Sequence, residues 1–164
     1  FFVSCTDNLN FDNINLDIEP VVTLPIISLD LIQTDFLDEN NQEITVLSDI
    51  TAFRIFDNTI IKDNLLELII DFEIENGFDR SFLVNVVFID ADGNITYNVD
   101  DFLINAGNLN YSTTRSIVME SSPEFLNSTK IRVDVFLSPS STILNPDIEK
   151  TFKFRSSGTC YLEY

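Results

Sequence analysis

Five consecutive residues, Asp90-Ala91-Asp92-Gly93-Asn94, bring together oxygen-bearing side chains of the kind that bind calcium. An EF-hand loop needs glycine at its sixth position and a bidentate glutamate at its twelfth, whereas here, counting from Asp90, Gly93 is fourth and Asp101 is twelfth. The same letters are typical of a tight turn, because Asp-Gly is a standard hairpin signal. The sequence therefore predicts a turn, and leaves Asp90, Asp92 and Asn94 as the alternative candidate for a metal site.

Paired carboxylates occur at Asp38-Glu39, at Asp100-Asp101 and at Glu73 with Glu75. Glycoside hydrolysis needs two acids that flank one bond. The chain has no His and no Trp, so the commonest general base and the commonest sugar-stacking ring are both missing, although Tyr97 and Tyr111 remain as stacking candidates. We expect a protein without catalytic activity and without a cofactor, because no set of residues in the sequence forms a recognisable active site.

The two cysteines, Cys5 and Cys160, carry the remaining chemistry. Cys5 follows a small residue, Ser4, which leaves room for a lipid-modifying enzyme and a peptidase, and it precedes a polar stretch rich in Asp and Asn. These features predict that Cys5 is lipidated, with residues 1–4 as a signal-peptide remnant and residues 5–20 as an acidic tether. A disulfide between Cys5 and Cys160, or a buried free thiol, remains open.

The charge is strongly negative and unevenly distributed. There are 9 basic and 27 acidic residues, a formal net charge of −18, and no Lys or Arg precedes Arg54. Nucleic acid and anionic lipid surfaces would be repelled, so any membrane attachment should come from the lipid. We expect a basic or neutral protein partner, with Asp35, Asp38 and Glu39 as the candidate partner-binding residues.

Apolar residues alternate with polar ones over most of the chain, which is the period of a β-strand. In residues 65–75, Leu66, Leu68, Ile70, Phe72 and Ile74 share one face. Residues 82–89 are apolar on both faces, as in a central strand. Turn residues at 76–80 and 90–94 predict two successive hairpins, a meander that ends in a strand at 95–97.

Further strands are predicted at 26–32, 51–56, 112–119, 130–137 and 151–155, with 160–163 pairing last. Only residues 122–126 read as helical, with Ser122 as N-cap and Pro123 at the first helical position. Short strands at this spacing favour one all-β domain over residues 21–164, an antiparallel sandwich of immunoglobulin-like type, with a small closed barrel as the alternative. No apolar run is long enough to form a membrane-spanning helix.

The residues Phe2-Val3-Ser4-Cys5 resemble a lipobox, with Phe2 where Leu is usual. With its acidic tether, the chain resembles a small outer-membrane lipoprotein of the Bacteroidota type. This resemblance implies a lipid-anchored accessory subunit of an outer-membrane protein complex for secretion, barrel assembly or uptake, on the periplasmic or the cell-surface side. A surface adhesin or carbohydrate-binding lipoprotein, with or without calcium, is the alternative that it leaves open.

Overall fold

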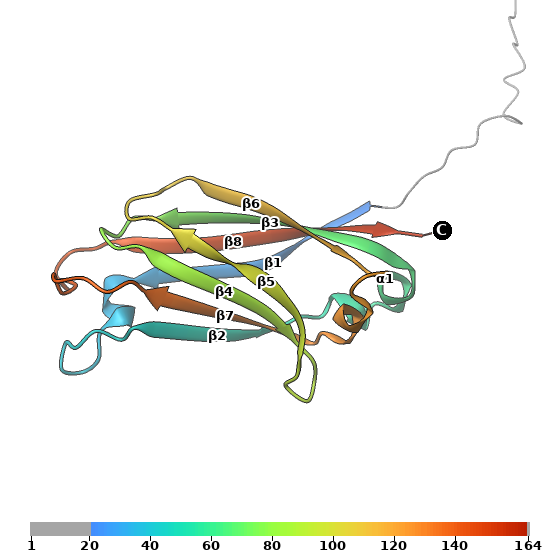
Figure 1. The fold of residues 1–164 in the computed structure, drawn as a ribbon, viewed down its shortest axis with the longest axis horizontal. Coiled ribbons are helices and arrows are strands. Elements are labelled where there is room, and N and C mark those ends of the chain that lie inside the picture. The colour runs from blue at the N-terminus through green and yellow to red at the C-terminus, as the bar shows by residue number, and fades with distance from the viewer. Residues whose placement is uncertain (1–20, 164) are drawn as a thin grey trace, which may run out of the picture.

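The computed structural model describes residues 21–163, which form two four-stranded antiparallel sheets packed face to face. The strands run along the long axis of the molecule, and α1 lies at the end where β1 begins (Figure 1). The first sheet has the order β1 (Val21–Ile32), β8 (Thr151–Leu162), β3 (Leu65–Asn76), β6 (Tyr111–Val118). The second has the order β2 (Val46–Ala52), β7 (Lys130–Leu137), β4 (Phe82–Ile89), β5 (Ile95–Ile104). The predicted sandwich is confirmed, and the two sheets are not joined into a barrel.

The strand order couples early strands to late ones. β1 pairs with β8, β2 with β7, β3 with β6 and β4 with β5, and successive strands of the chain often lie in different sheets. An eight-stranded double sheet with this pattern is a jelly roll. The immunoglobulin order differs, because it places the first two strands side by side in one sheet.

Phenylalanine rings fill the space between the sheets. Nine of them are fully buried. Ring contacts join them in three groups, namely Phe36, Phe78, Phe82 and Phe152, then Phe72, Phe102 and Phe154, and finally Phe88 with Phe125. Burying one such side chain is worth about 2–3 kcal/mol relative to leaving it in water. The positions that alternate inward along the strands therefore supply most of the core.

The alternation predicted for β3 is confirmed from Leu68 to Ile74, but the first two residues of the strand point to the opposite faces from those predicted. Leu65 is buried, whereas Leu66, expected on the inner face, is 48% exposed. The pairing of β3 with β8 shifts register between Leu65 and Glu67, so one extra residue is accommodated there. A bulge of this kind moves the side chains before it to the opposite face.

The hairpin predicted between residues 82–89 and 95–97 is confirmed, because β4 pairs with β5. The hairpin predicted at 76–80 is wrong, since β3 and β4 lie in different sheets. The buried Asn76 side chain organises this crossing: its Nδ2 donates to the carbonyls of Arg80 and Asn105, and its Oδ1 accepts from the N–H of Phe78. The turn residues thus mark a corner between the sheets.

The strand predicted at 51–56 is wrong in position. β2 ends at Ala52, a 3-10 turn, η2, covers Ile55–Asp57, and a short helix, α1, covers Thr59–Asn64. Ile55 and the adjacent Phe56 are both buried, and a strand would turn one of them outward. Asn58 caps α1 by accepting from the N–H of Ile60.

The remaining predicted elements differ from the structure mainly in length. The segments predicted at 151–155 and 160–163 are one continuous strand, β8, and the strand predicted at 26–32 begins at Val21. The strands predicted at 112–119 and 130–137 correspond to β6 and β7, and the predicted helical turn is a 3-10 helix, η3, at Pro123–Asn127. No helix within residues 21–163 has both the length and the apolar character needed to cross a membrane.

Candidate interaction surface

Four strands lie at sheet edges, and two of them, β1 and β2, border the same side of the sandwich. β1 is the edge of the first sheet and β2 is the edge of the second. β1 carries Pro25 and a register shift beside it, two devices that discourage pairing with a further strand. β2 pairs with β7 through all seven of its residues without any shift, and it contains no Pro, Lys or Arg. β2 is therefore a regular edge, without the proline or the register shift that β1 carries.

The inward side of β2 is not covered. Leu47, Asp49 and Thr51 lie opposite Val135, Val133 and Ile131, which are all buried in the core. Directly opposed residues in an antiparallel ladder share a face, so these three β2 side chains point toward the interior. Asp49 and Thr51 are nevertheless exposed, and Leu47 is only half-buried. The sandwich is open along this side.

The opposite wall of the opening is apolar. Leu29 and Leu31 of β1 pair with Phe154 and Phe152, so they also face inward, and both are half-buried. At the α1 end, Leu24 and Ile26 meet the segment that follows β2 around a cavity of about 400 Å³. We name this opening the β1–β2 seam, and it is formed by Leu24, Ile26, Leu29, Leu31, Leu47, Asp49 and Thr51.

The backbone of β2 presents unpaired groups along the seam. Leu137 donates to the carbonyl of Thr45 (2.9 Å), and Phe53 donates to the carbonyl of Thr129 (2.8 Å). In an antiparallel ladder such bonds recur at every second residue, so residues 45, 47, 49, 51 and 53 point their N–H and C=O groups toward β7. The N–H and C=O groups of Ser48 and Ile50 consequently point to the free edge.

The other side of the sandwich, between β5 and β6, is closed. Arg115 of β6 lies opposite the buried Ile70, so its side chain points inward. Its Nε is 3.5 Å from the carboxylate of Asp100 on β5, and its guanidinium lies 5.3 Å from the centre of the Phe102 ring. Charge and aromatic contacts thus seal this side, and the β1–β2 seam is the open one.

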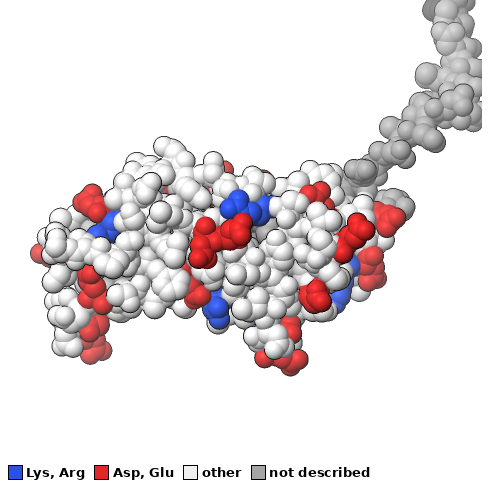
Figure 2. Space-filling model, in the orientation of Figure 1, with Lys and Arg blue, Asp and Glu red and all other residues white. Residues whose placement is uncertain are grey.

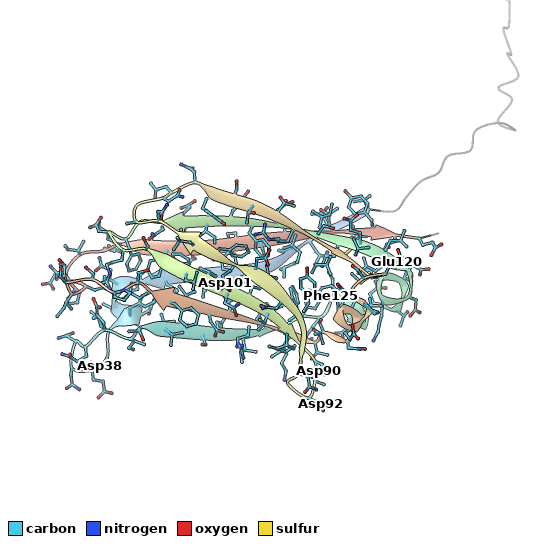
Figure 3. The ribbon with its side chains drawn as sticks, viewed as in Figure 1. Asp38, Asp90, Asp92, Asp101, Glu120 and Phe125 are labelled. Carbon is cyan, nitrogen blue, oxygen red and sulfur yellow. The ribbon has the colours of Figure 1, made fainter. Side chains whose placement is uncertain are left out.

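The candidate calcium loop is a hydrogen-bonded turn. Oδ1 of Asp90 accepts from the N–H groups of Asp92 (2.9 Å) and Asn94 (2.8 Å), and Oδ2 accepts from Nδ2 of Asn94 (2.9 Å). The Asn94 side-chain bond and then the backbone bonds lower the pKa of Asp90. Figure 3 shows Asp90 and Asp92 at the tip of the loop between β4 and β5. Within residues 21–163, no three acidic, cysteine or histidine side chains gather closely enough to hold a metal ion.

The candidate partner-binding residues lie at the end of the molecule opposite α1, where Figure 3 labels Asp38. Asp35 accepts from the N–H of Ile32, and Asp38 accepts from the N–H groups of Asn40 and Gln42 (2.8 Å each). These two carboxylates therefore stabilise local turns, and Glu39 is exposed without such a bond in the described structure. Figure 2 shows the acidic side chains on this face in several separate groups and not in one patch.

The carboxylate pairs do not converge on a common point. Asp100 contacts Arg115, whereas Asp101 accepts from Nδ2 of Asn85 (2.8 Å). Glu73 and Glu75 both lie on the outer face of β3. Tyr97 and Tyr111 pack against core rings, with centroids 5.8 Å from Phe125 and 6.2 Å from Phe102 respectively.

Cys160 in β8 forms no disulfide within residues 21–163 and has no exposed surface, and burial raises its pKa. A buried thiol with a raised pKa is chemically inert. Cys5, the predicted lipidation site, and the tether up to residue 20 lie outside the described residues.

No protein-family model matches the chain, and no curated protein matches its sequence. Among solved structures, the chain is similar to a protein from Parabacteroides distasonis ATCC 8503 described as secreted, with a TM-score of 0.52 and 12% identity over 70% of this chain and 38% of that one. It is also similar to VP2 in the infectious bursal disease virus subviral particle, with a TM-score of 0.47 and 11% identity over 89% of this chain and 33% of that one. The chain thus spans 38% and 33% of the lengths of these two proteins. The first likeness supports the fold alone.

The residues of the seam were not predicted from the sequence. The sequence around Asp49 gives one indication of this site, because Asp49 is the single charged residue in the run from Ile44 to Ala52. Its inward direction depends on the pairing with Val133, which only the structure supplies.

Proposed function

We propose that the chain is a lipid-anchored, non-catalytic interaction module, an accessory subunit of an outer-membrane protein complex, and that β2 is its docking edge. The observation that supports docking is the β1–β2 seam, where a regular edge strand with exposed inward side chains faces an apolar wall. An extended segment of a partner would pair with the free N–H and C=O groups of Ser48 and Ile50. It would place alternate side chains in the seam, as in other cases of strand addition.

The membrane anchor in this proposal is supported by the lipobox-like residues Phe2-Val3-Ser4-Cys5. We expect the mature chain from a lipoprotein-processing host to begin at Cys5 and to carry more than one acyl chain. A single chain binds a bilayer only reversibly, since each buried CH₂ contributes about 0.8 kcal/mol. Intact mass spectrometry measures this directly. A mature chain without acyl mass, or one that contains a Cys5–Cys160 disulfide, would refute the anchor.

The docking edge is tested by Ile50→Pro. Proline removes the N–H that faces the free edge and leaves the bonds between β2 and β7 intact, and edge strands tolerate proline at such positions. The Ile50 side chain is 56% exposed, so little packing is lost. We expect the membrane protein that co-purifies stoichiometrically with the wild type from detergent-solubilised membranes to fall by at least about tenfold, a loss of roughly 1.4 kcal/mol.

Ile50→Ala is the matched control, because it removes the same side chain but keeps the N–H. It should retain the wild-type amount of partner, and both variants should melt within a few degrees of the wild type. If Ile50→Pro is folded and still recovers the partner at wild-type yield, β2 is not the docking edge.

A further inference from the structure

Within residues 21–163, two edge strands point a charged side chain into the sandwich, and one of these charges is paired with another charge of the described residues. On β6, inward-facing Arg115 is 3.5 Å from Asp100 of the neighbouring edge strand. On β2, inward-facing Asp49 makes no hydrogen bond or ion pair with any residue in the described part of the chain. An inward charge on an edge strand opposes indiscriminate pairing, because an added strand would bury that charge without compensation.

Asp49 also opposes pairing between two copies of this chain. In the antiparallel register that pairs all seven residues of β2 with a second β2, Asp49 lies opposite Asp49. Ser48 and Ile50 then form the hydrogen-bonded pairs, so position 49 is a non-hydrogen-bonded pair, in which the side chains are closest. Like charges directly opposed across strands are destabilising, and two bodies of formal charge −18 repel each other in addition. β2 is therefore suited to pairing with a strand of another protein and not with the β2 of a second copy of this chain.

We propose that β2 accepts an extended segment of another protein that places a lysine or arginine side chain opposite Asp49 and apolar side chains two residues to either side. This inference rests on the proposed function and specifies the chemistry of the partner. The cation compensates Asp49 as Asp100 compensates Arg115 across the sandwich. The flanking apolar side chains enter the seam beside Leu47 and face Leu29 and Leu31 of β1.

The polarity of the seam supports this order of side chains. Its walls are aliphatic except at Asp49 and Thr51, so the charged position lies between Leu47 and Thr51 on β2 and faces the aliphatic side chains of β1. A partner with an acidic residue at the central position would meet repulsion, and one with a neutral residue would leave Asp49 uncompensated. Charge at one position of an otherwise uncharged edge thus selects the partner and fixes its register.

The test uses synthetic strands matched in length to β2. The probe is acetyl-Thr-Val-Thr-Lys-Thr-Val-Thr-amide, in which both Val and the Lys share one face. A second peptide has Glu in place of Lys. A third exchanges Lys with a neighbouring Thr, so that its charge is unchanged but points to the other face. Binding to wild type, Asp49→Lys and Ile50→Pro is measured by fluorescence anisotropy of labelled peptides at 0.15 M salt, up to about 1 mM peptide.

We expect the wild type to bind the first peptide at least about fivefold more tightly than either of the others, and Asp49→Lys to prefer the Glu peptide. Ile50→Pro should bind none of them measurably. If the wild type binds all three equally and Ile50→Pro abolishes binding, the edge accepts strands but Asp49 does not select them, and the inference fails while the proposed function stands. If no peptide binds folded wild type, the inference is likewise overturned. The proposed function is then decided separately, by the amount of membrane partner that co-purifies with Ile50→Pro.

Discussion

Replacing Phe53 by alanine is expected to lower the free energy of unfolding by about 4 kcal/mol. Phe53 directly follows β2, is 6% exposed, and its ring lies 5.4 Å from Phe56, 5.1 Å from Phe88 and 5.8 Å from Phe125, centre to centre. Truncation removes the apolar area of one ring and leaves a cavity among three others. These neighbours belong to separate elements, η2, β4 and η3, so they cannot close the space by a simple shift of one segment.

Urea denaturation followed by far-ultraviolet circular dichroism measures this change. Phe53→Leu is the matched control and should cost less than about 1.5 kcal/mol, because most of the volume remains. Ile60→Ala, at a side chain 66% exposed, should change the stability by no more than about 0.5 kcal/mol. A loss below about 1 kcal/mol for Phe53→Ala would contradict the packing described for this end of the sandwich.

Arg80→Ala is expected to cost about 3 kcal/mol, since it removes a buried guanidinium group with its hydrogen bonds and leaves a partly buried carboxylate unpaired. The Arg80 side chain is 7% exposed and donates from Nη1 and Nη2 to the two carboxylate oxygens of Glu43, at 2.9 and 3.3 Å. It also donates to the carbonyls of Ser138 and Thr142. Three segments that are distant in the sequence are therefore held by one guanidinium group. Lys153→Ala, in an exposed pair with Glu75, should cost less than about 1 kcal/mol.

The same ion pair makes part of the stability dependent on pH. Burial alone would raise the pKa of Glu43, but the Arg80 hydrogen bond, the N–H of Leu144 and the Arg80 charge together lower it below the ordinary 4.5. A lowered pKa in the folded state stabilises the protein above the ordinary pKa, and this contribution is lost as the pH falls through the lowered value. The difference in stability between wild type and Arg80→Ala should therefore shrink as the pH falls below about 4.5. A difference that stays constant down to pH 2 would exclude the Glu43 carboxylate as its source.

These two sites hold the two ends of the proposed docking edge. Glu43 lies three residues before β2 and Phe53 lies immediately after it. β2 is paired on one side only, so its position depends on these end contacts as well as on β7. A docking edge that is fixed before the partner arrives avoids part of the entropic cost of binding.

The strands whose faces are clearly distinguished by polarity could be predicted from the sequence. β7 has the predicted bounds, and Leu68 to Ile74 of β3 have the predicted inward direction. The partner of each strand could not be predicted, because turn residues such as those at 76–80 reverse the chain equally well within one sheet and between two. The bulge at Leu65–Glu67 was missed for a related reason, since it depends on the pairing of β3 with β8.

The β1–β2 seam could not be predicted from the sequence, because it is defined by the absence of a strand beside the free edge of β2. The sequence predicts Asp35 and Asp38 as partner-binding residues because they are acidic. In the structure their oxygens accept hydrogen bonds from nearby backbone N–H groups, which is a common use of Asp in turns. Asp49 has the same side chain without such a role. The difference between these carboxylates lies in the backbone around them and not in the local composition.

The pairing of the first described strand with the last one determines when the chain can fold. Val21 of β1 lies opposite Tyr161 of β8, and β8 is also the partner of β3. The first sheet cannot be completed without β8, and within residues 21–163 only β4 with β5 is a pairing between strands that follow one another in the chain. Such non-local pairing makes folding slow.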